Sequence, residues 1–234
     1  MSNYYDTNKE SYENPKSVAV YDAEKNKWSE DYVFKKYFKV GRKILDIGCG
    51  TGRTSAELFD RGLFVEGIDY SEAMIARAKE KLGSKISFKT MDASSLEYPA
   101  ESFDYALFSF NGLDYLYPKD RRQQALVEIS RVLKPEGIFV FSTHNSCFVP
   151  NNIYRLYLTL KSFLYGKVHP YRLEFHAFGR LVTHYISPRK QIEDLKSAGF
   201  ECLEIVSKYS KNINTISLKD PYPTYVCRKI SKNS

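Results

Sequence analysis

A short apolar run, Lys43–Ile47, ends in a glycine-rich turn that leads into a helical pattern. The turn reads Gly48-Cys-Gly-Thr-Gly52, so three glycines stand at alternate positions directly after the predicted strand. Glycine tolerates positive φ and lets a ligand approach the backbone, and the following helix directs free N–H groups at that ligand. A strand, a glycine turn and a helix in this order indicate an α/β sheet that binds a ligand at the carboxyl ends of its strands.

Strand and helix patterns alternate along the chain, which predicts an α/β fold with a Rossmann-like, seven-stranded, mostly parallel sheet and helices on both faces. Apolar spacing and glycine or proline stops set the expected bounds. Strands are predicted at 43–47, 63–69, 86–90, 103–110, 138–142, 201–207 and 222–230, and helices at 28–40, 54–61, 71–82, 119–133 and 191–198.

The length of 234 residues fits one such domain, 1–234. Within it we expect a helical or loop cover at 1–40 and a small cap inserted after the fifth strand at 145–187. No apolar run approaches the roughly 20 residues that span a bilayer, and the polar N-terminus lacks an apolar signal core. These features favour a soluble, cytoplasmic protein without a membrane span. The four cysteines form no C-x-x-C pair, so we expect no metal site.

The spacing of the glycines separates two nucleotide-binding patterns. The dinucleotide fingerprint requires G-x-G-x-x-G, but Arg53 stands at its last position when counted from Gly48. This spacing disfavours an NAD-dependent oxidoreductase, which would share the same sheet. The pattern Asp46-x-Gly48-x-Gly50-x-Gly52 instead resembles the first motif of the class I S-adenosylmethionine-dependent methyltransferases.

Four later motifs in the right order extend the resemblance. They are Gly67-Ile-Asp69-Tyr70, Met91-Asp92-Ala93, the strand and loop Phe103–Leu116, and Leu133-Lys-Pro-Glu-Gly137. The resemblance covers residues 40–145 well and 185–230 more loosely. It implies a methyltransferase with S-adenosylmethionine as cofactor and S-adenosylhomocysteine as product.

The resemblance also implies roles for individual residues. Asp69 would accept hydrogen bonds from both ribose hydroxyls, Met74 would pack on adenine, and Asp92 would accept from the adenine amino group. The other implied cofactor-binding residues are Asp46, Gly48, Cys49, Gly50, Gly52, Tyr70, Ala93, Phe108 and Asn111. Structural alternatives stay open: a loop or helix cap for Asp46, an ordinary strand-end acid for Asp69, a core position for Met74 and a turn for Asp92.

The predicted cap is aromatic and basic. It carries nine aromatic residues, and between Asn145 and Lys190 there are seven Lys or Arg residues and one acid, which accounts for most of the net charge of +7. A helix is predicted at 153–165. The cap either packs on the domain with its basic residues solvated, or forms a lid that lines an acceptor pocket. A basic lid favours a small acceptor bearing phosphate or carboxylate.

Two further functions stay open beside a small-molecule methyltransferase. Basic residues interleaved with aromatic ones can hold phosphates and stack bases, which would suit an RNA methyltransferase. The loop Asn111-Gly-Leu-Asp114 lacks the N-P-P-Y pattern of enzymes that methylate nucleic-acid amino groups, so we prefer a small molecule over nucleic acid. The other alternative is a non-catalytic S-adenosylmethionine-binding protein. No sequence feature indicates an oligomeric state.

A hydroxyl or ammonium acceptor must lose a proton when it is methylated, and a histidine can take it. His144 is the leading candidate for this base because it follows the fifth strand, whose carboxyl end borders the cofactor cleft; its alternative role is a structural hydrogen bond. His176 and His184 are further candidates. Three N-terminal tyrosines are expected to close over the site: Tyr5, Tyr12 and Tyr21.

Overall fold

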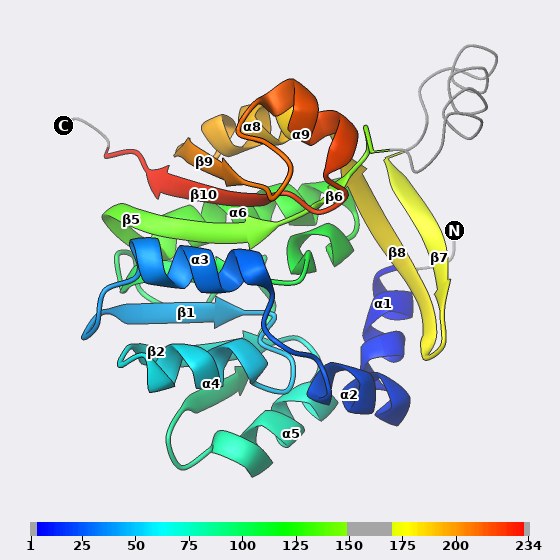
Figure 1. The fold of residues 1–234 in the computed structure, drawn as a ribbon. Helices are drawn as coiled ribbons and strands as arrows, with labels where there is room; N and C mark the ends of the chain where they lie inside the picture. The colour runs from blue at the N-terminus through cyan, green and yellow to red at the C-terminus, as the bar shows by residue number, and fades with distance from the viewer. Residues whose placement is uncertain (1–3, 149–169, 232–234) are drawn as a thin grey trace.

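The computed structural model describes residues 4–148 and 170–231, with side chains described from residue 7 onward. Its main sheet has seven strands (Figure 1). In sheet order they are β3 (Ser87–Thr90), β2 (Phe64–Asp69), β1 (Lys43–Ile47), β4 (Phe103–Phe108), β5 (Leu133–Ser142), β10 (Thr224–Lys229) and β9 (Phe200–Val206). Strand β10 runs antiparallel to β5 and β9, whereas β1 to β5 are paired in parallel. The predicted seven-stranded, mostly parallel sheet is therefore confirmed.

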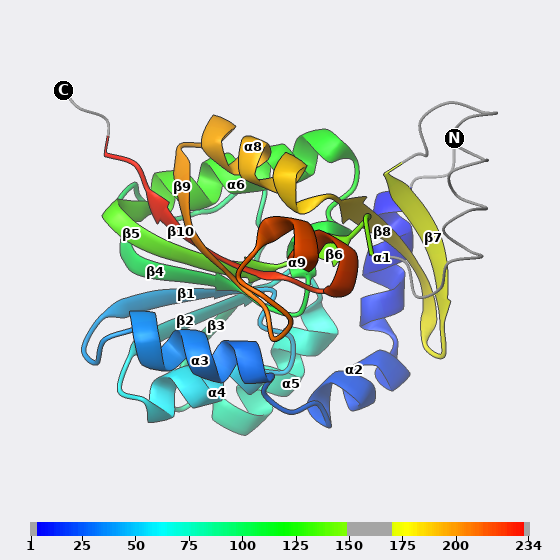
Figure 2. The same cartoon turned by 45° about the horizontal axis from the view of Figure 1, so that its top comes forward.

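Helices cover both faces of this sheet, as Figure 2 shows. One face carries α3 (Trp28–Tyr37), α4 (Arg53–Asp60) and α5 (Glu72–Leu82), and the other carries α6 (Lys119–Val132) and α8 (Pro188–Ser197). The two cores follow the alternation of side chains along a strand. In β1, Ile44 packs with the α3–α5 layer and Leu45 with the α6–α8 layer, and both are fully buried.

A second, smaller unit lies beyond the carboxyl ends of the parallel strands (Figure 1). It consists of the strands β6 (His144–Asn145), β8 (Gly179–Ile186) and β7 (Tyr171–His176), in that order, with α1 (Tyr4–Glu13) and α2 (Pro15–Asp22) beside them. Asn8 joins helix and strand, because its Nδ2 donates to the carbonyl of Val182 at 3.0 Å and its Oδ1 accepts from the Val182 N–H at 2.7 Å. The N-terminal helices and the β7–β8 hairpin thus cover the edge where a ligand is expected.

Some element bounds differ from the predicted ones. Strand β5 begins at Leu133, where the helix was expected to end, because Leu133 pairs with Phe103 at the start of β4. The β7–β8 hairpin and α9 (Ile213–Lys219) were not predicted. The helix predicted at 153–165 lies outside the described residues. Within the part that is described, no helix is both long and apolar enough to cross a membrane.

Candidate functional site

The glycine turn after β1 has the backbone that its sequence predicted. Gly48, Gly50 and Gly52 all have positive φ, at 61°, 55° and 86°. A Cβ on Gly48 would lie 2.7 Å from the Phe108 ring, so the turn and β4 pack without room for a side chain. A Cβ on Gly50 would meet nothing within 4 Å and would point into open space. The turn is therefore tight on one side and open to a ligand on the other.

A pocket opens over this turn at the carboxyl ends of β1, β2 and β4, and we call it the cofactor pocket. Nine of the predicted cofactor-binding residues line it: Gly48, Cys49, Gly50, Asp69, Tyr70, Met74, Asp92, Ala93 and Phe108. Three others do not: Asp46 lies beneath the turn, Gly52 begins helix α4, and Asn111 lines a neighbouring pocket. Most of the predicted set thus converges on one cavity.

Asp69 lies at the end of β2 and is clamped by the glycine turn. Its Oδ2 accepts from the Gly50 N–H at 2.9 Å, and its Oδ1 accepts from the Ser71 N–H at 2.9 Å. Burial raises the pKa of Asp69 to about 6, although both of these hydrogen bonds act in the opposite direction. The carboxylate therefore has a fixed orientation at the pocket wall.

Asp46 has a different environment, although the same motif contains it. Its Oδ2 accepts from the hydroxyls of Thr54 and Ser55 at 2.7 and 2.6 Å. Its Oδ1 is buried and has no hydrogen-bond partner among the described residues. Burial raises the pKa of Asp46 to about 6. The carboxylate anchors the start of helix α4 beneath the turn through side-chain hydroxyls, and Gly52 stands at the N-cap of that helix.

Met74 and Asp92 lie at the part of the pocket where the resemblance places adenine. Met74 is 2% exposed and belongs to a small hydrophobic cluster that contains Tyr12. The Oδ1 of Asp92 accepts from the N–H and the hydroxyl of Ser94 at 2.8 and 2.7 Å, and its Oδ2 forms an ion pair with Arg121. Asp92 therefore forms a local turn and also faces the pocket.

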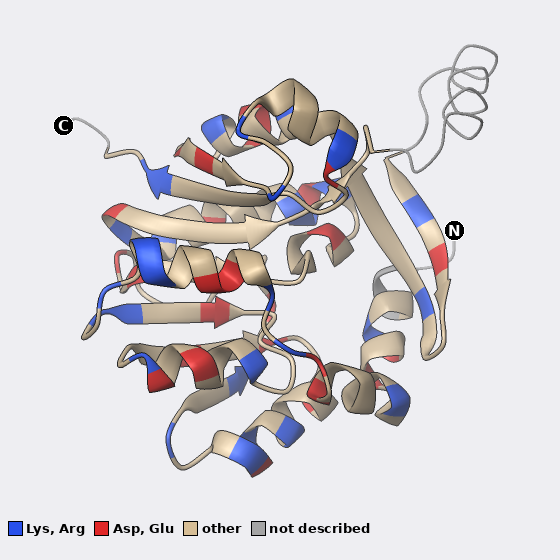
Figure 3. Ribbon diagram, viewed as in Figure 1, with Lys and Arg blue, Asp and Glu red and all other residues tan. Residues whose placement is uncertain are grey.

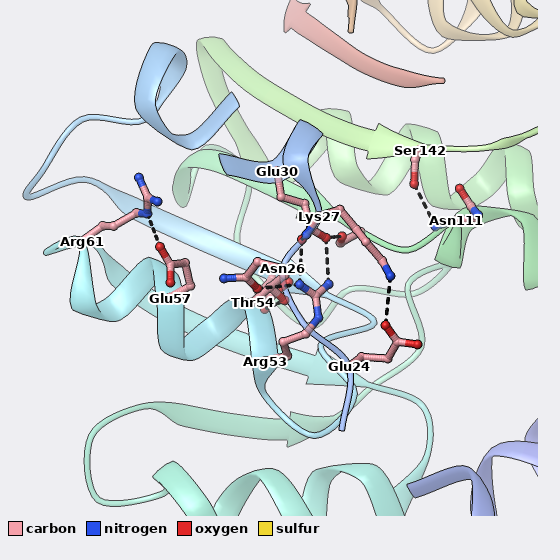
Figure 4. A network of polar contacts seen from close by, with 12 residues as sticks. Glu24, Asn26, Lys27, Glu30, Arg53, Thr54, Glu57, Arg61, Asn111 and Ser142 are labelled. Carbon is pink, nitrogen blue, oxygen red and sulfur yellow. Dashed lines mark hydrogen bonds and ion pairs between the residues drawn. The ribbon is translucent and has the colours of Figure 1, made fainter. Parts of the chain in front are cut away.

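Arg53, the residue that breaks the dinucleotide fingerprint, connects the glycine turn to helix α3 (Figure 4). It donates to both carboxylate oxygens of Glu30 at 2.7 Å and to Oδ1 of Asn26 at 2.6 Å. The Ser109 hydroxyl also donates to Glu30. Burial acts to raise the pKa of Glu30, but the hydrogen bonds and charge of Arg53 outweigh it, so this pKa is lowered. Sequence reasoning missed this network, because nothing local signals a pairing across 23 residues.

The predicted tyrosine cover is present for two of its three members. Tyr12 and Tyr21 line the cofactor pocket, and the Tyr12 ring lies 5.9 Å from that of Tyr70 and 5.8 Å from that of Tyr115. The side chain of Tyr5 lies outside those described.

Hydrogen bonds to helix α5 hold the covering helices α1 and α2 in place. Glu13 accepts from the N–H groups of Glu72 and Ala73 at 2.8 and 3.0 Å, in the first turn of the helix. Asp22 accepts from the guanidinium of Arg77 at 2.8 Å. Helices α1 and α2 are therefore docked over the pocket at both ends.

A second pocket adjoins the first, and we call it the acceptor pocket. Both pockets share the lining residues Tyr21, Glu24, Ser109, Phe110 and Tyr115. The acceptor pocket continues past the carboxyl ends of β4 and β5 toward the start of β10, and Asn111, Ser142 and His144 belong to it. The Asn111 N–H donates to the Ser142 hydroxyl at 3.0 Å, which joins the ends of the two strands (Figure 4).

His144 is held in this pocket by Asp114. The Oδ2 of Asp114 accepts from the backbone N–H of His144 at 2.5 Å and lies 3.0 Å from its ring Nδ1. Asp114 is fully buried, and burial acts to raise its pKa, but the hydrogen bond from His144 and the nearby His184 and Arg122 lower this pKa overall. The ionised carboxylate accepts a hydrogen bond from the Nδ1–H of His144. The Nε2 of His144 has no hydrogen bond to any residue within 4–148 or 170–231.

The other two histidine candidates are placed differently. His176 lines the acceptor pocket and stacks on Phe178 at 5.3 Å. His184 lines neither pocket; its Nδ1 lies 3.8 Å from Asp114, and burial lowers its pKa. His184 therefore lies beside Asp114 but outside both pockets.

The basic residues of the predicted cap do not form a basic pocket in the part that is described. Arg172, Arg180, Arg189 and Lys190 line neither cavity. Arg172 lies over the Tyr185 ring at 3.9 Å, and Lys190 pairs with Glu193 and Asp194. Figure 3 shows blue and red segments close together on the β7–β8 hairpin. Arg155, Lys161 and Lys167 lie outside the described residues.

A glycine turn and a clamped strand-end acid at the carboxyl ends of this sheet are the features that the methyltransferase resemblance predicted, and comparisons with known proteins identify the class. A family model described as "Methyltransferase domain" matches residues 44–137. The demethylmenaquinone methyltransferase of Staphylococcus haemolyticus is 30% identical over 191 residues, which are 77% of each chain. The chain belongs to the class I S-adenosylmethionine-dependent methyltransferases.

Other comparisons set the extent of this similarity. The YqeM protein of Bacillus subtilis is 37% identical over 137 residues, which are 58% of this chain and 53% of that protein. The chain thus spans about half the length of the first curated relatives it matches. A solved S-adenosylmethionine-dependent methyltransferase from Methanosarcina mazei shares the fold, with a TM-score of 0.69, 24% identity, and coverage of 86% of this chain and 98% of that one.

The residues of the cofactor pocket fit S-adenosylmethionine, the cofactor of this family. The clamped carboxylate of Asp69 can accept from ribose hydroxyls. Met74 and Ala93 offer an apolar surface for a flat base. The open space above Gly50 is one that a Cβ would fill.

Proposed function

We propose that this chain transfers a methyl group to an oxygen or nitrogen atom of a small molecule. The observation that carries the proposal is the His144–Asp114 pair in the pocket that adjoins the cofactor pocket. It supplies a proton acceptor beside the place where a second ligand would lie. A protein that only binds the cofactor has no need of such a pair.

Different residues of this chain would bind different parts of the cofactor. Asp69 would hold the ribose, Met74 and Ala93 the base, and the N–H groups of the glycine turn the rest of the ligand. S-adenosylmethionine supplies a methyl group that its sulfonium already activates. The protein therefore contributes mainly position and exclusion of water. Tyr12 and Tyr21 serve the exclusion, because their rings line the cavity beneath α1 and α2.

The orientation of His144 indicates where the proton of the acceptor goes. The acceptor oxygen or nitrogen would bond to the methyl carbon as the carbon–sulfur bond of the donor breaks and S-adenosylhomocysteine leaves, and it would give up its proton to Nε2 of His144. Asp114 keeps Nδ1 protonated before the transfer and stabilises the imidazolium after it.

Two measurements test the proposal. Calorimetry is expected to show binding of S-adenosylhomocysteine, and its absence would reject the proposal. Incubation with methyl-labelled cofactor and fractionated cell extract is then expected to label small molecules in the wild type and far less in His144→Ala. Label in RNA would favour the nucleic-acid alternative, and cofactor binding without label in any fraction would favour a non-catalytic protein. The control is Asp60→Asn, which changes an exposed acid at the end of α4. It shows any loss of labelling that comes from preparing a variant protein.

A further inference from the structure

The charged side chains around the acceptor pocket are largely engaged within the protein. Lys27 Nζ lies 2.9 Å from Glu24 Oε2, and Glu30 is bound by Arg53 through two bonds of 2.7 Å. Asp220 accepts from the Tyr222 N–H at 2.9 Å. The Lys27–Glu24 and Arg53–Glu30 ion pairs therefore neutralise their charges before any ligand enters, and Asp220 is held by a backbone N–H.

One lysine of this pocket has no carboxylate partner within the described ranges. Lys208 is exposed, and its Nζ lies 5.3 Å from the centre of the Tyr209 ring. A solvated lysine at a pocket mouth contributes little to binding an anion, because water screens its charge. The described residues that line this pocket thus include no buried lysine or arginine that could bind a phosphate or carboxylate.

Eight Phe, Tyr or Trp residues are among the other residues that line the pocket. Phe141 is fully buried, Tyr115 is half-buried, and Phe178 stacks with His176. The Tyr222 ring meets His144 edge-on at 5.3 Å, with an interplanar angle of 87°. Rings therefore extend from the proposed proton acceptor to the rim.

The rim itself is aromatic and solvent-exposed. Trp28, Tyr209 and Tyr222 line the mouth of the pocket and are 57%, 45% and 55% exposed. Large apolar side chains gathered around the opening of a cavity mark a binding surface, because water contact with them is unfavourable. Aromatic rings bind flat rings through stacked and edge-on contacts.

We propose that the methyl acceptor is an uncharged, planar ring compound that carries a ring hydroxyl or ring N–H. This inference rests on the proposed function and specifies its substrate class. The heteroatom lies at His144 beside the Tyr222 ring, the flat body lies among the aromatic side chains, and its far end reaches Trp28 and Tyr209 at the rim. An anionic acceptor, which the charge of the chain favours, is the alternative that the test below distinguishes.

Three probes of one carbon skeleton test the proposal by calorimetry with the full chain saturated in S-adenosylhomocysteine. They are 2-naphthol, which is flat and neutral, 2-naphthyl phosphate, which is flat and anionic, and decahydro-2-naphthol, which is neutral and puckered. We expect 2-naphthol to bind at least tenfold more tightly than the other two. Tighter binding of the phosphate, lost in Lys208→Ala, would overturn the proposal in favour of an anionic acceptor. Equal binding of the puckered alcohol, or no binding of 2-naphthol, would also overturn it.

Variants locate the bound ring. Trp28→Ala and Tyr222→Ala are each expected to weaken 2-naphthol binding severalfold and to leave the affinity for S-adenosylhomocysteine unchanged. Phe64→Ala is the matched control, because Phe64 is 65% exposed but lies at the opposite, amino end of β2. Equal losses in the control would overturn the assignment to the rim. Since binding of S-adenosylhomocysteine is measured first, failure of the proposed function is distinguished from failure of this inference.

Discussion

The ring Nδ1 of His144 lies 3.0 Å from Oδ2 of Asp114, and the same oxygen accepts the backbone N–H of His144. Two bonds from one residue to one carboxylate oxygen fix both the position and the tautomer of the imidazole. Asp114 is in turn surrounded by Arg122 and His184, at 3.7 and 3.8 Å. The structure therefore holds the imidazole in one orientation before any acceptor binds.

This pair predicts a loss of turnover without a loss of cofactor binding. His144→Ala is expected to lower turnover roughly a hundredfold, and Asp114→Asn to lower it by a similar factor because the amide no longer fixes the tautomer. Affinity for S-adenosylhomocysteine, measured by calorimetry, stays within about twofold. A larger loss of turnover in His176→Ala than in His144→Ala would transfer the role to His176.

Asp69 predicts a cofactor affinity that depends on pH. Asp69→Ala is expected to weaken binding of S-adenosylhomocysteine by about 1.5–3 kcal/mol, through loss of hydrogen bonds to a charged group. Since its pKa is about 6 and the ionised form accepts the ribose hydroxyls, affinity falls as the pH drops through 6. Calorimetry between pH 5 and 7.5 checks this. The dependence is expected to vanish in Asp69→Asn; its loss in Asp46→Asn alone would assign it to the acid beneath the turn.

Asp46 predicts a pH-dependent effect on stability. Its pKa is about 6 in the folded protein and 3.8 in the reference state, so the folded state holds its proton more tightly. Between these values stability falls as the pH rises, and the cost of the buried charge is fully present above pH 6. Asp46→Asn removes that charge. Its effect on the melting temperature is therefore expected to be more favourable at pH 7.5 than at pH 4.5. A shift of equal size at both values would show that ionisation of Asp46 does not matter.

The Glu30–Arg53 pair predicts a large loss of stability when one partner is removed. The side chains are 6% and 15% exposed, so Glu30→Gln leaves a nearly buried guanidinium without its counter-charge. We expect a loss of about 3 kcal/mol in the free energy of unfolding, measured with urea. Asp31 lies on the same helix as Glu30 but at the surface. Asp31→Asn breaks its ion pairs with Lys35 of α3 and Arg61 at the end of α4, and is expected to cost less. Equal losses would mean that burial does not govern the Glu30 pair.

Local patterns predicted most of the sheet and much of the cofactor pocket. Gly48, Gly50, Asp69 and Met74 lie within turns and helix starts that short sequence windows specify, and all four line the cavity. Asp46 belongs to the same motif yet lies beneath the turn, because the hydroxyls of the following helix bind it. A motif records which residues recur together and does not say which of them faces the ligand.

The remaining features depend on contacts between distant parts of the chain. His144 and Asp114 are 30 residues apart, and the fold alone brings them together. The β7–β8 hairpin carries charged and apolar residues without a clean alternation; Phe175 is 78% exposed. This hairpin is stabilised by pairing within itself and by Asn8 of α1, 174 residues from Val182. No local window contains that information.

The two pockets are lined mainly by different stretches of the chain. Residues 44–137, the part that matches the family model, contain the glycine turn, Asp69 and Asp92. The acceptor pocket is built mainly from segments outside that range, in α2 and α3, at the ends of β5, β7 and β9, and around the start of β10. Substitutions in those segments can alter which molecule is methylated while the donor site stays intact. Selection can therefore diversify the acceptor and preserve the donor independently within one fold.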